Sequence, residues 1–429
     1  MKISNEQIDK LLDELLELHP KRIDLSLGRV RNLLKKLDNP QDKIKNIIHI
    51  GSTNGKYSVL RFIQEILRYN KKTTNAYISP HLMRFNERFQ LMDYEISNEI
   101  LFSILKKVND TNDNDSITFF EATSAAFFEA ASKNSADYTL LEVGLGGRLD
   151  STNVITPVIS VINSISYDHQ DFLGDDIFKI AFEKSGIIKK NIPIVIGYQP
   201  YEEAKQILID QAQYMEAPTF IYGYDFFISE EKDTLIYEDP DNRIKFSNIN
   251  KKLGQFQIKN LATAVATCLQ LYKIEVHNFL LNDIHLNIHF PGRFEKLIKG
   301  NLYKLISNQN ELYLDGSHNP DGSKNINESL KRLPKKKLCL IVGMIKSKDP
   351  VKYVSEYENI ENIITIAIPN ENNSYGSEEL KNILSLTLGN VQSSDSIQEA
   401  IKVTSEKFPD SRILICGSLY LAGKVLEMN

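Results

Sequence analysis

Short apolar runs alternate with segments of helical spacing along most of this chain, and this alternation restricts the fold more than any other feature. A strand buried on both faces of a parallel sheet reads as a nearly unbroken β-branched or aromatic run. Helical segments between such strands are the crossovers that parallel pairing requires. The chain is therefore predicted to be an α/β protein. The candidate strands of its first part are residues 47–50, 75–79, 138–143, 158–165 and 192–197, and the candidate helices are 6–18, 59–69, 120–132 and 258–272.

A change in this pattern predicts two domains. Residues 218–250 read as short strands separated by acidic turns, which indicates an antiparallel edge or excursion. Pro291 and Gly292 then interrupt regular structure just before a new series of strands and helices. We therefore expect a first domain over residues 1–290 with a mainly parallel sheet, and a smaller Rossmann-like α/β domain over residues 291–429. Strands of the second domain are predicted at 312–314, 338–342, 363–367 and 412–416.

Charge and cysteine usage restrict the possible partners. The 51 basic and 56 acidic residues are mixed along the chain, so no basic stripe is offered to nucleic acid or to anionic lipid. The three cysteines lack CxxC spacing, which favours buried thiols in a reducing compartment over disulfides or a zinc site. No apolar stretch approaches the ~20 residues that span a bilayer, and the N-terminus lacks a signal-peptide pattern. We expect a cytoplasmic monomer that acts on small molecules.

A Gly-Lys pair lies directly after the apolar run 47–50 and directly before a helical segment. Backbone N–H groups of such a strand-to-helix loop converge on an anion, while the lysine reaches the outer phosphates and a hydroxyl binds Mg²⁺. A plain glycine turn with a surface lysine fits the same letters, so at this point both interpretations stand. If the loop binds ATP, its contacts are Thr53, Asn54, Gly55, Lys56, Tyr57 and Ser58.

A motif at residues 23–29 precedes the loop, and several further motifs follow the loop in a fixed order. They lie at residues 79–82, 84–88, 118–121, 141–153, 168–174, 183–188, 291–295 and 315–320. Together these motifs resemble those of the bifunctional dihydrofolate synthase/folylpolyglutamate synthases of the Mur ligase superfamily, over nearly the whole chain. The loop departs from that family at Ser52 and Tyr57, where the family usually has glycine. The resemblance implies a phosphate-loop ATPase domain followed by a glutamate-ligase domain.

Two groups suited to a metal lie close behind predicted strands. Glu142 ends the apolar run 139–141, and His169 follows the run 158–165 after a short polar turn, at the sheet edge where α/β proteins bind ligands. Taken alone, His169 is more typical of a solvent-facing loop. The resemblance implies two Mg²⁺ sites and a Lys184 carbamylated by CO₂ into a carboxylate-like anion. The implied metal-binding residues are Ser58, Glu142, His169 and Lys184, and the implied catalytic residues are Lys56, His169 and Lys184.

The resemblance also implies contacts to nucleotide and acceptor. The amides of Gln257 and Asn260 would contact the nucleotide, although helix capping is the ordinary alternative for Asn260. Phe120 would stack on the pterin ring, with core packing as an equally good interpretation. The nucleotide contacts implied for the second domain are Arg293, Asp315 and His318, and the implied substrate contacts are Arg84, Thr118, Phe120, Asp150, Ser151 and Ser418.

The activity that the resemblance implies is ATP-dependent addition of L-glutamate to dihydropteroate and to (tetrahydro)folate polyglutamates, through an acyl phosphate. Three other interpretations stay open. They are a Mur-type amino-acid ligase with another acceptor, a phosphate-loop kinase or NTPase, and an inactive folate-binding paralogue, the last because of Ser52 and Tyr57. Glutamate-dependent release of ADP separates the ligases from the kinases and NTPases.

Overall fold

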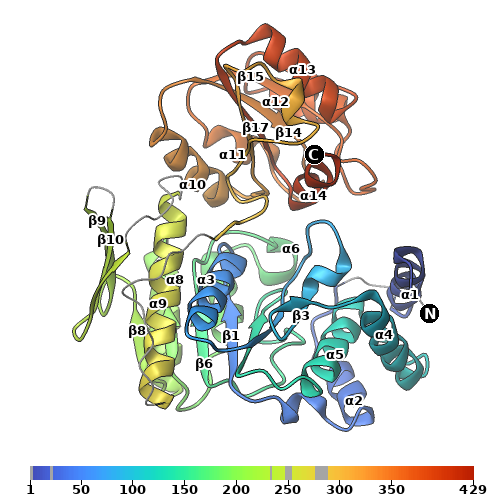
Figure 1. Ribbon diagram of the computed structural model, residues 1–429, viewed down its shortest axis with the longest axis vertical. Coiled ribbons are helices and arrows are strands. Elements are labelled where there is room, and N and C mark those ends of the chain that lie inside the picture. The colour runs from blue at the N-terminus through green and yellow to red at the C-terminus, as the bar shows by residue number, and fades with distance from the viewer. Residues whose placement is uncertain (1–2, 20–22, 232–233, 247–253, 276–287) are drawn as a thin grey trace. The chain divides into compact units, whose positions relative to one another are not determined.

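The computed structural model describes residues 3–19, 23–231, 234–246, 254–275 and 288–429. The chain forms two compact units, each with its own main sheet (Figure 1). The first unit comprises Met1–Lys251 and Gln257–Ile288, and the second comprises Lys252–Phe256 and His289–Asn429. The second unit thus includes a short segment ahead of residue 257 that the sequence pattern assigns to the first domain. Phe256 explains this grouping, because its side chain packs against the core of the second unit.

The first unit is built on an eight-stranded, mainly parallel sheet of order β4-β3-β2-β5-β1-β6-β7-β8. The neighbours in the series β2-β5-β1-β6-β7-β8 pair in parallel. Only the β2-β3 and β3-β4 pairs are antiparallel. The prediction of an α/β fold with a mainly parallel first sheet is confirmed. The bounds are β1 Ile47–Gly51, β2 Thr74–Tyr77, β3 Phe89–Leu91, β4 Tyr94–Glu95, β5 Tyr138–Glu142, β6 Ile159–Ile162, β7 Ile194–Ile196 and β8 Thr219–Ile221.

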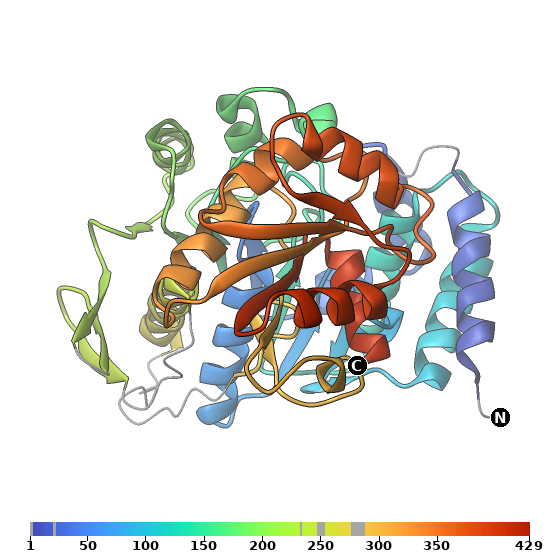
Figure 2. The ribbon, with the colours of Figure 1, turned by 90° about the horizontal axis from the view of Figure 1, so that it is seen from above.

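The prediction for residues 218–250 is partly wrong. The first strand of this segment, β8, pairs in parallel with β7 and completes the main sheet, instead of forming an antiparallel edge. The strands after it do form a separate antiparallel sheet of order β11-β10-β9, which projects beyond β8 in Figures 1 and 2. The short length of β8 hides its pairing from the sequence. The bounds are β9 Phe227–Glu231, β10 Thr234–Glu238 and β11 Arg243–Phe246.

Helices cover both faces of the first sheet. Figures 1 and 2 show α9 beside α3, and Figure 2 shows α8 on the opposite side of the strands. Serine, threonine or aspartate side chains cap the N-termini of several helices, as the sequence pattern favours. The bounds are α1 Asn5–Glu17, α2 Gly28–Lys36, η1 Pro40–Lys43, α3 Lys56–Tyr69, η2 Phe85–Arg88, α4 Asn98–Asn112, α5 Phe119–Ser132, α6 Gln170–Leu173, α7 Ile177–Ser185, α8 Glu202–Tyr214 and α9 Gln255–Glu275.

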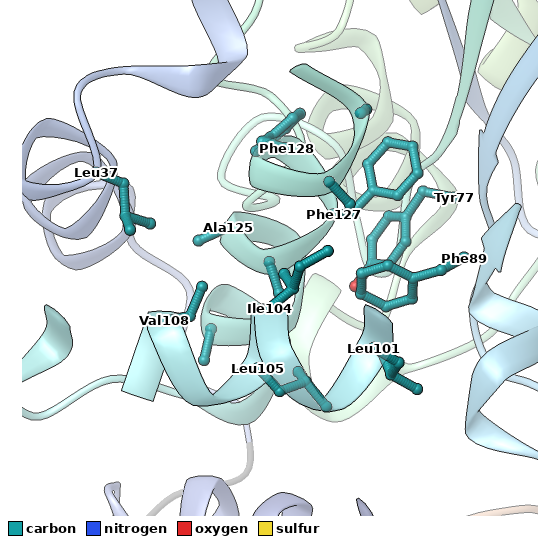
Figure 3. Close-up of a cluster of buried hydrophobic side chains, with 14 of the residues drawn as sticks. Leu37, Tyr77, Phe89, Leu101, Ile104, Leu105, Val108, Ala125, Phe127 and Phe128 are labelled. Atoms are coloured by element: carbon teal, nitrogen blue, oxygen red, sulfur yellow. The ribbon is translucent and has the colours of Figure 1, made fainter. Parts of the chain in front are cut away.

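Helix α5 is the centre of one core of the first unit. Eleven consecutive residues of α5 are buried, because the helix packs against α2, α4 and the sheet at once. Figure 3 shows the ring of Tyr77 from β2 beside Phe127 of α5 and Phe89 of β3. The ring centroids of Tyr77 and Phe127 lie 5.0 Å apart in a stacked arrangement. Truncation of a buried phenylalanine such as Phe127 to alanine costs about 3–5 kcal/mol of stability.

The second unit has a six-stranded sheet of order β12-β13-β17-β14-β15-β16. Only β12 pairs antiparallel, and β13 to β17 match the strands predicted for this part except for the unpredicted β16. The prediction of a second α/β unit is confirmed. The bounds are β12 Glu295–Leu297, η3 Tyr303–Leu305, β13 Glu311–Leu314, α10 Pro320–Lys331, β14 Lys337–Val342, α11 Pro350–Ser355, β15 Ile360–Thr365, α12 Ser377–Ser385, β16 Val391–Ser393, α13 Ile397–Lys407, β17 Ser411–Cys416 and α14 Leu419–Met428.

Among the described residues, no helix is both long enough and apolar enough to cross a membrane.

Candidate active site

The loop between β1 and α3 has the geometry of a phosphate-binding loop. Gly55 stands at its end with φ of +86°, in the left-handed region, and α3 begins at the next residue. A Cβ at this position would lie 2.5 Å from the side-chain nitrogen of Asn163 and 2.8 Å from the Oδ1 of Asn260. Both the backbone angle and the space therefore require glycine. The backbone N–H groups in the first turn of α3 have no acceptor within the helix and face the loop.

The loop is tied to the segment that follows β6. The backbone N–H groups of Thr53 and Asn54 both donate to the carbonyl of Ser164, over 2.8 and 3.2 Å. The Thr53 hydroxyl donates to the Ser166 carbonyl and accepts from the Ser166 N–H. These bonds fix the loop before any ligand binds, so its shape is preorganised.

The two departures from the family pattern are accommodated. Ser52 is buried, and its hydroxyl donates to the Asn54 carbonyl at 2.9 Å. Tyr57 is the second residue of α3 and has ordinary helical geometry. Neither residue has the positive φ that would demand glycine. The backbone reason for expecting glycine at these positions is therefore absent.

Two lysines meet on one carbonyl of the loop. The Nζ atoms of Lys56 and Lys184 lie 2.9 and 3.1 Å from the Ser52 carbonyl oxygen. Lys184 comes from the last turn of α7 and is buried. Burial and, to a lesser extent, the neighbouring charge of Lys56 lower the pKa of the Lys184 ammonium to about 7, although Asp168 and Asp150 act in the opposite direction. A substantial fraction of Lys184 is therefore a neutral amine at neutral pH.

Glu142 ends β5 beside a hydroxyl that has no partner. Its Oε2 accepts the backbone N–H of Ser79 at 3.0 Å. The Ser79 hydroxyl is buried and has no hydrogen-bond partner among the described residues. A carboxylate and an unsatisfied hydroxyl are oxygen ligands of the kind that Mg²⁺ takes. Ser79 is therefore a candidate ligand that the sequence reasoning missed, although it lies in the motif at 79–82.

His169 stands at the N-terminus of α6 with φ of +52°. Its side chain is 42% exposed, and its Nε2 lies 3.8 Å from the carboxylate of Asp168. Within the described residues, the side chains of His, Cys, Asp and Glu do not gather in a group of three or more that could hold a metal by themselves. Any Mg²⁺ here therefore needs further oxygen ligands, as is usual when the ion binds together with nucleotide phosphates.

The amides predicted to contact the nucleotide form a buried relay to the loop. Gln257 donates from its Nε2 to the Ser58 hydroxyl at 3.0 Å, and the Nδ2 of Asn260 donates to the side-chain oxygen Oε1 of Gln257 at 3.2 Å. Asn163, which the sequence reasoning missed, donates to Asn260 at 2.8 Å. The capping alternative for Asn260 is wrong, because α9 begins at Gln255 and Asn260 lies inside it. The relay orients Ser58 from the side of α9.

The side chains of Thr118 and Asp150 form hydrogen bonds with other groups of the protein. Thr118 caps α5, and its N–H and hydroxyl both donate to Glu121 at 2.8 Å. Asp150 is buried, and its two carboxylate oxygens accept the N–H groups of Leu145 and Thr152. Burial raises the pKa of the Asp150 carboxyl, and these donors oppose that rise. Both side chains therefore shape the region where the acceptor was predicted to bind.

The other predicted acceptor residues lie in the same unit. Phe120 is half-buried and stacks on Tyr77 at 5.8 Å, while its ring lies so close to Gly144 that a Cβ there would meet it at 2.3 Å. Core packing therefore accounts for part of the Phe120 ring. The Ser151 hydroxyl is 2.7 Å from that of Ser124. Arg84 is exposed and pairs with Glu95 at 2.8 Å.

The predicted residues of the second unit lie in two loops and a helix cap. Asp315 is buried and accepts the N–H groups of Phe294 and Ser317, both at 2.8 Å. Burial raises the pKa of Asp315, and the charge of Arg293 opposes this rise. His318 follows in the same loop, and Ser418 caps α14 through the N–H of Tyr420. Hydrogen bonds to Asp315 thus join the turn at Arg293 to the loop after β13.

Comparison with known proteins decides the family. The Mur ligase middle domain model matches residues 50–268, and the Mur ligase glutamate ligase domain model matches residues 292–419. The chain belongs to the Mur ligase family. This Mur ligase is 31% identical over 419 residues to the folylpolyglutamate synthase of Lacticaseibacillus casei, covering 93% of each protein. It is 30% identical to the dihydrofolate synthase/folylpolyglutamate synthase of Bacillus subtilis, covering 93% of this chain and 94% of that one.

Solved structures agree with this Mur ligase along nearly all of its length. Escherichia coli FolC in complex with DHPP and ADP superimposes with a TM-score of 0.86 at 27% identity, covering 98% of this chain and 97% of that one. The folylpolyglutamate synthase of Thermotoga maritima gives a TM-score of 0.77 at 29% identity, with 98% and 97% covered. The resemblance predicted from the motifs is confirmed.

Proposed function

We propose that this Mur ligase joins L-glutamate to the carboxylate of dihydropteroate and of folates, with ATP as the energy source. The observation that carries the proposal is the convergence of Lys56 and Lys184 on one carbonyl of the phosphate loop. It occurs in a chain similar at nearly full length to dihydrofolate synthase/folylpolyglutamate synthases. Escherichia coli FolC, which was solved with DHPP and ADP, supports both the acceptor class and the nucleotide.

The chemistry proceeds in two steps. The acceptor carboxylate attacks the γ-phosphoryl of ATP, which forms an acyl phosphate and releases ADP. The neutral amine of glutamate then attacks the acyl carbon, so that an amide forms, phosphate leaves and the amine loses its proton. Lys56 stabilises negative charge on the transferred phosphoryl group, and the N–H groups of Thr53 and Asn54 keep the loop in a fixed shape.

The first unit fits a divalent cation. Glu142 supplies a buried carboxylate, and the unsatisfied Ser79 hydroxyl supplies a second oxygen beside it. Ser58, held by Gln257, would approach the ion from the phosphate loop, and His169 would serve a second site. Mg²⁺ bound there neutralises phosphate charge during transfer. ATP and two Mg²⁺ ions are thus the cofactors of the proposal.

Carbamylation of Lys184 is part of the proposal. Only a neutral amine attacks CO₂, giving a carbamate and one proton, and the lowered pKa of Lys184 provides that amine near neutral pH. The carbamate is anionic, so it would be attracted by Lys56 where the ammonium is repelled. It would also add an oxygen ligand that the group around Glu142 and His169 lacks.

Each of the two units would contribute residues to substrate binding. We assign ATP binding to the first unit and glutamate binding to the second, over the proposed domains 1–290 and 291–429. The second unit would contribute Arg293, Asp315 and His318 to the nucleotide and Ser418 to glutamate. A cytoplasmic monomer belongs to the same proposal, and the three buried free cysteines support a reducing compartment.

Product analysis tests the proposal directly. The purified chain is incubated with MgATP and L-glutamate in two parallel reactions, one with dihydropteroate and one with tetrahydrofolate. The products of each reaction are identified by mass spectrometry. One added glutamate on each acceptor, with ADP release that needs glutamate, supports both activities. Product from tetrahydrofolate alone reduces the function to folylpolyglutamate synthase. ADP release without glutamate indicates a kinase or NTPase, and no turnover with either acceptor rejects the folate ligase.

A further inference from the structure

A histidine lies fully buried in the middle of β1, just ahead of the phosphate loop. His49 pairs with Leu141 of β5 on one side and with Ser160 of β6 on the other. Its Nε2 lies 2.9 Å from the Thr152 hydroxyl oxygen. Its Nδ1 is buried without a partner among the described residues. None of the roles assigned above uses this side chain.

The direction of these hydrogen bonds follows from the donors available. The Thr152 hydroxyl donates its single hydrogen to Asp150 Oδ1 at 2.5 Å. A hydroxyl that has donated its hydrogen can only accept from another group. His49 therefore donates from Nε2, and its Nδ1 carries the lone pair. The relay runs from His49 through Thr152 to the Asp150 carboxylate.

The carboxylate at the end of this relay closes a loop. Asp150 Oδ1 accepts the N–H of Thr152 at 3.0 Å, and Oδ2 accepts the N–H of Leu145 at 2.8 Å. These bonds hold the two ends of the segment 145–152 together. The segment begins three residues after Glu142, and it carries Asp150 and Ser151, both predicted to contact the acceptor.

The same segment packs on the turn that presents Lys184. A Cβ on Gly147 would lie 2.9 Å from the carbonyl oxygens of both Glu183 and Lys184. The backbone N–H of Arg148 donates to the Glu183 carbonyl at 2.7 Å. Segment 145–152 is therefore anchored at Asp150 and also at the turn of Lys184.

We propose that His49 is a positioning residue of the ligase, which holds segment 145–152 through Thr152 and Asp150 in the arrangement that binds the pterin-bearing acceptor. This inference rests on the proposed function. An aliphatic residue would fill the same place between Leu141 and Ser160 without burying an unpaired nitrogen, which costs free energy. The imidazole contributes what an aliphatic side chain lacks, namely the N–H that fixes Thr152.

Two substitutions at one site separate the donor from the packing. His49→Gln retains a side-chain N–H at similar reach, whereas His49→Leu fills the space without a donor. His49→Leu should raise KM for dihydropteroate about tenfold, which corresponds to about one hydrogen bond lost from the support of segment 145–152, while the Kd for MgATP changes less than about twofold. His49→Gln should keep KM within about threefold of the unmutated value.

Thr152 supplies matched variants in case His49→Leu does not fold. Thr152→Val removes the hydroxyl at nearly constant volume, and Thr152→Ser keeps it. Thr152→Val should reproduce the acceptor KM of His49→Leu, Thr152→Ser should not, and the double variant His49→Leu/Thr152→Val should be no worse than either single variant. Additive losses, an unchanged acceptor KM in Thr152→Val, or equal losses of acceptor and MgATP binding would each overturn the relay.

Hydrogen exchange tests the relay without any substrate. The amides of Leu145 and Thr152 donate to Asp150, so His49→Leu and Thr152→Val should accelerate their exchange, while His49→Gln and Thr152→Ser should leave it unchanged. Unchanged exchange in both donor-free variants rejects the relay even if the enzyme is inactive. If the unmutated chain does not glutamylate dihydropteroate but the exchange behaves as expected, the proposed function fails and the relay stands.

Discussion

His49 should make the protein less stable as the pH falls below neutrality. Burial lowers the pKa of its imidazole from the usual 6.5 to about 3, and the charge of Lys189 acts in the same direction. Between these two values the unfolded chain binds a proton at His49 that the folded chain does not bind. The contribution of His49 to the free energy of unfolding is therefore fully present above pH 6.5 and is lost as the pH falls toward 3.

The size of the effect follows from the pKa values. A difference of 3.5 units, at about 1.4 kcal/mol per unit, gives about 5 kcal/mol over the whole range and about 2 kcal/mol between pH 7 and pH 5. His49→Gln keeps the N–H but cannot titrate, so its free energy of unfolding should fall about 2 kcal/mol less over that interval. The difference between the two proteins cancels the titration of all other groups.

Urea unfolding at pH 7, 6 and 5 measures this difference. The chain contains no tryptophan, so far-ultraviolet circular dichroism is the suitable signal. Thr152→Ser is the matched control, because it retains His49 and should show the pH dependence of the unmutated protein. Equal pH dependence in the unmutated protein and His49→Gln would refute the claim that a neutral, buried imidazole is present in the folded state.

Three further substitutions test the phosphate loop and the lysines. Lys56→Ala should lower kcat of ligation by about 10²-fold or more with an unchanged circular dichroism spectrum, and near-normal turnover would contradict its role at the phosphates. Lys184→Met should abolish a carbamate signal from ¹³C-labelled CO₂ in nuclear magnetic resonance spectra, and a signal retained in this variant would place the carbamate elsewhere. Gly55→Ala should lose about 1–3 kcal/mol of stability from its positive φ and contact with Asn163, which thermal unfolding measures; an unchanged melting temperature would contradict that requirement.

The sequence predicted the parallel strands because burial on both faces leaves a direct trace in the chain. Runs such as 138–143 and 338–342 are nearly unbroken in apolar residues, and both became central strands. Outside residues 218–250, the strands that were missed are β3, β4, β12 and β16, which have only two or three residues each. Elements of that length carry no readable period, and their pairing is decided by tertiary contacts.

The site was predictable only where residues cluster in sequence. The motif residues from Thr53 to Ser58 form one loop and the first turn of α3 because they are neighbours in the chain. The contacts around this loop and in segment 145–152 join residues about a hundred positions apart, as between Asn163 and Asn260 or between His49 and Thr152. Such pairs leave no local pattern, since either partner alone reads as an isolated polar residue in an apolar run. Only the fold brings them together.

The residues predicted to bind the acceptor also hold the site together, and this affects how their substitution must be interpreted. Thr118 caps α5, Asp150 closes segment 145–152, and Ser151 bonds Ser124 inside the core. Alanine at any of them would disturb the backbone as well as any ligand, so a fall in activity alone does not identify a contact. The ratio of losses is more informative. A disordered segment should weaken dihydropteroate and tetrahydrofolate alike, whereas a direct bond to the pterin of one acceptor should weaken that acceptor alone.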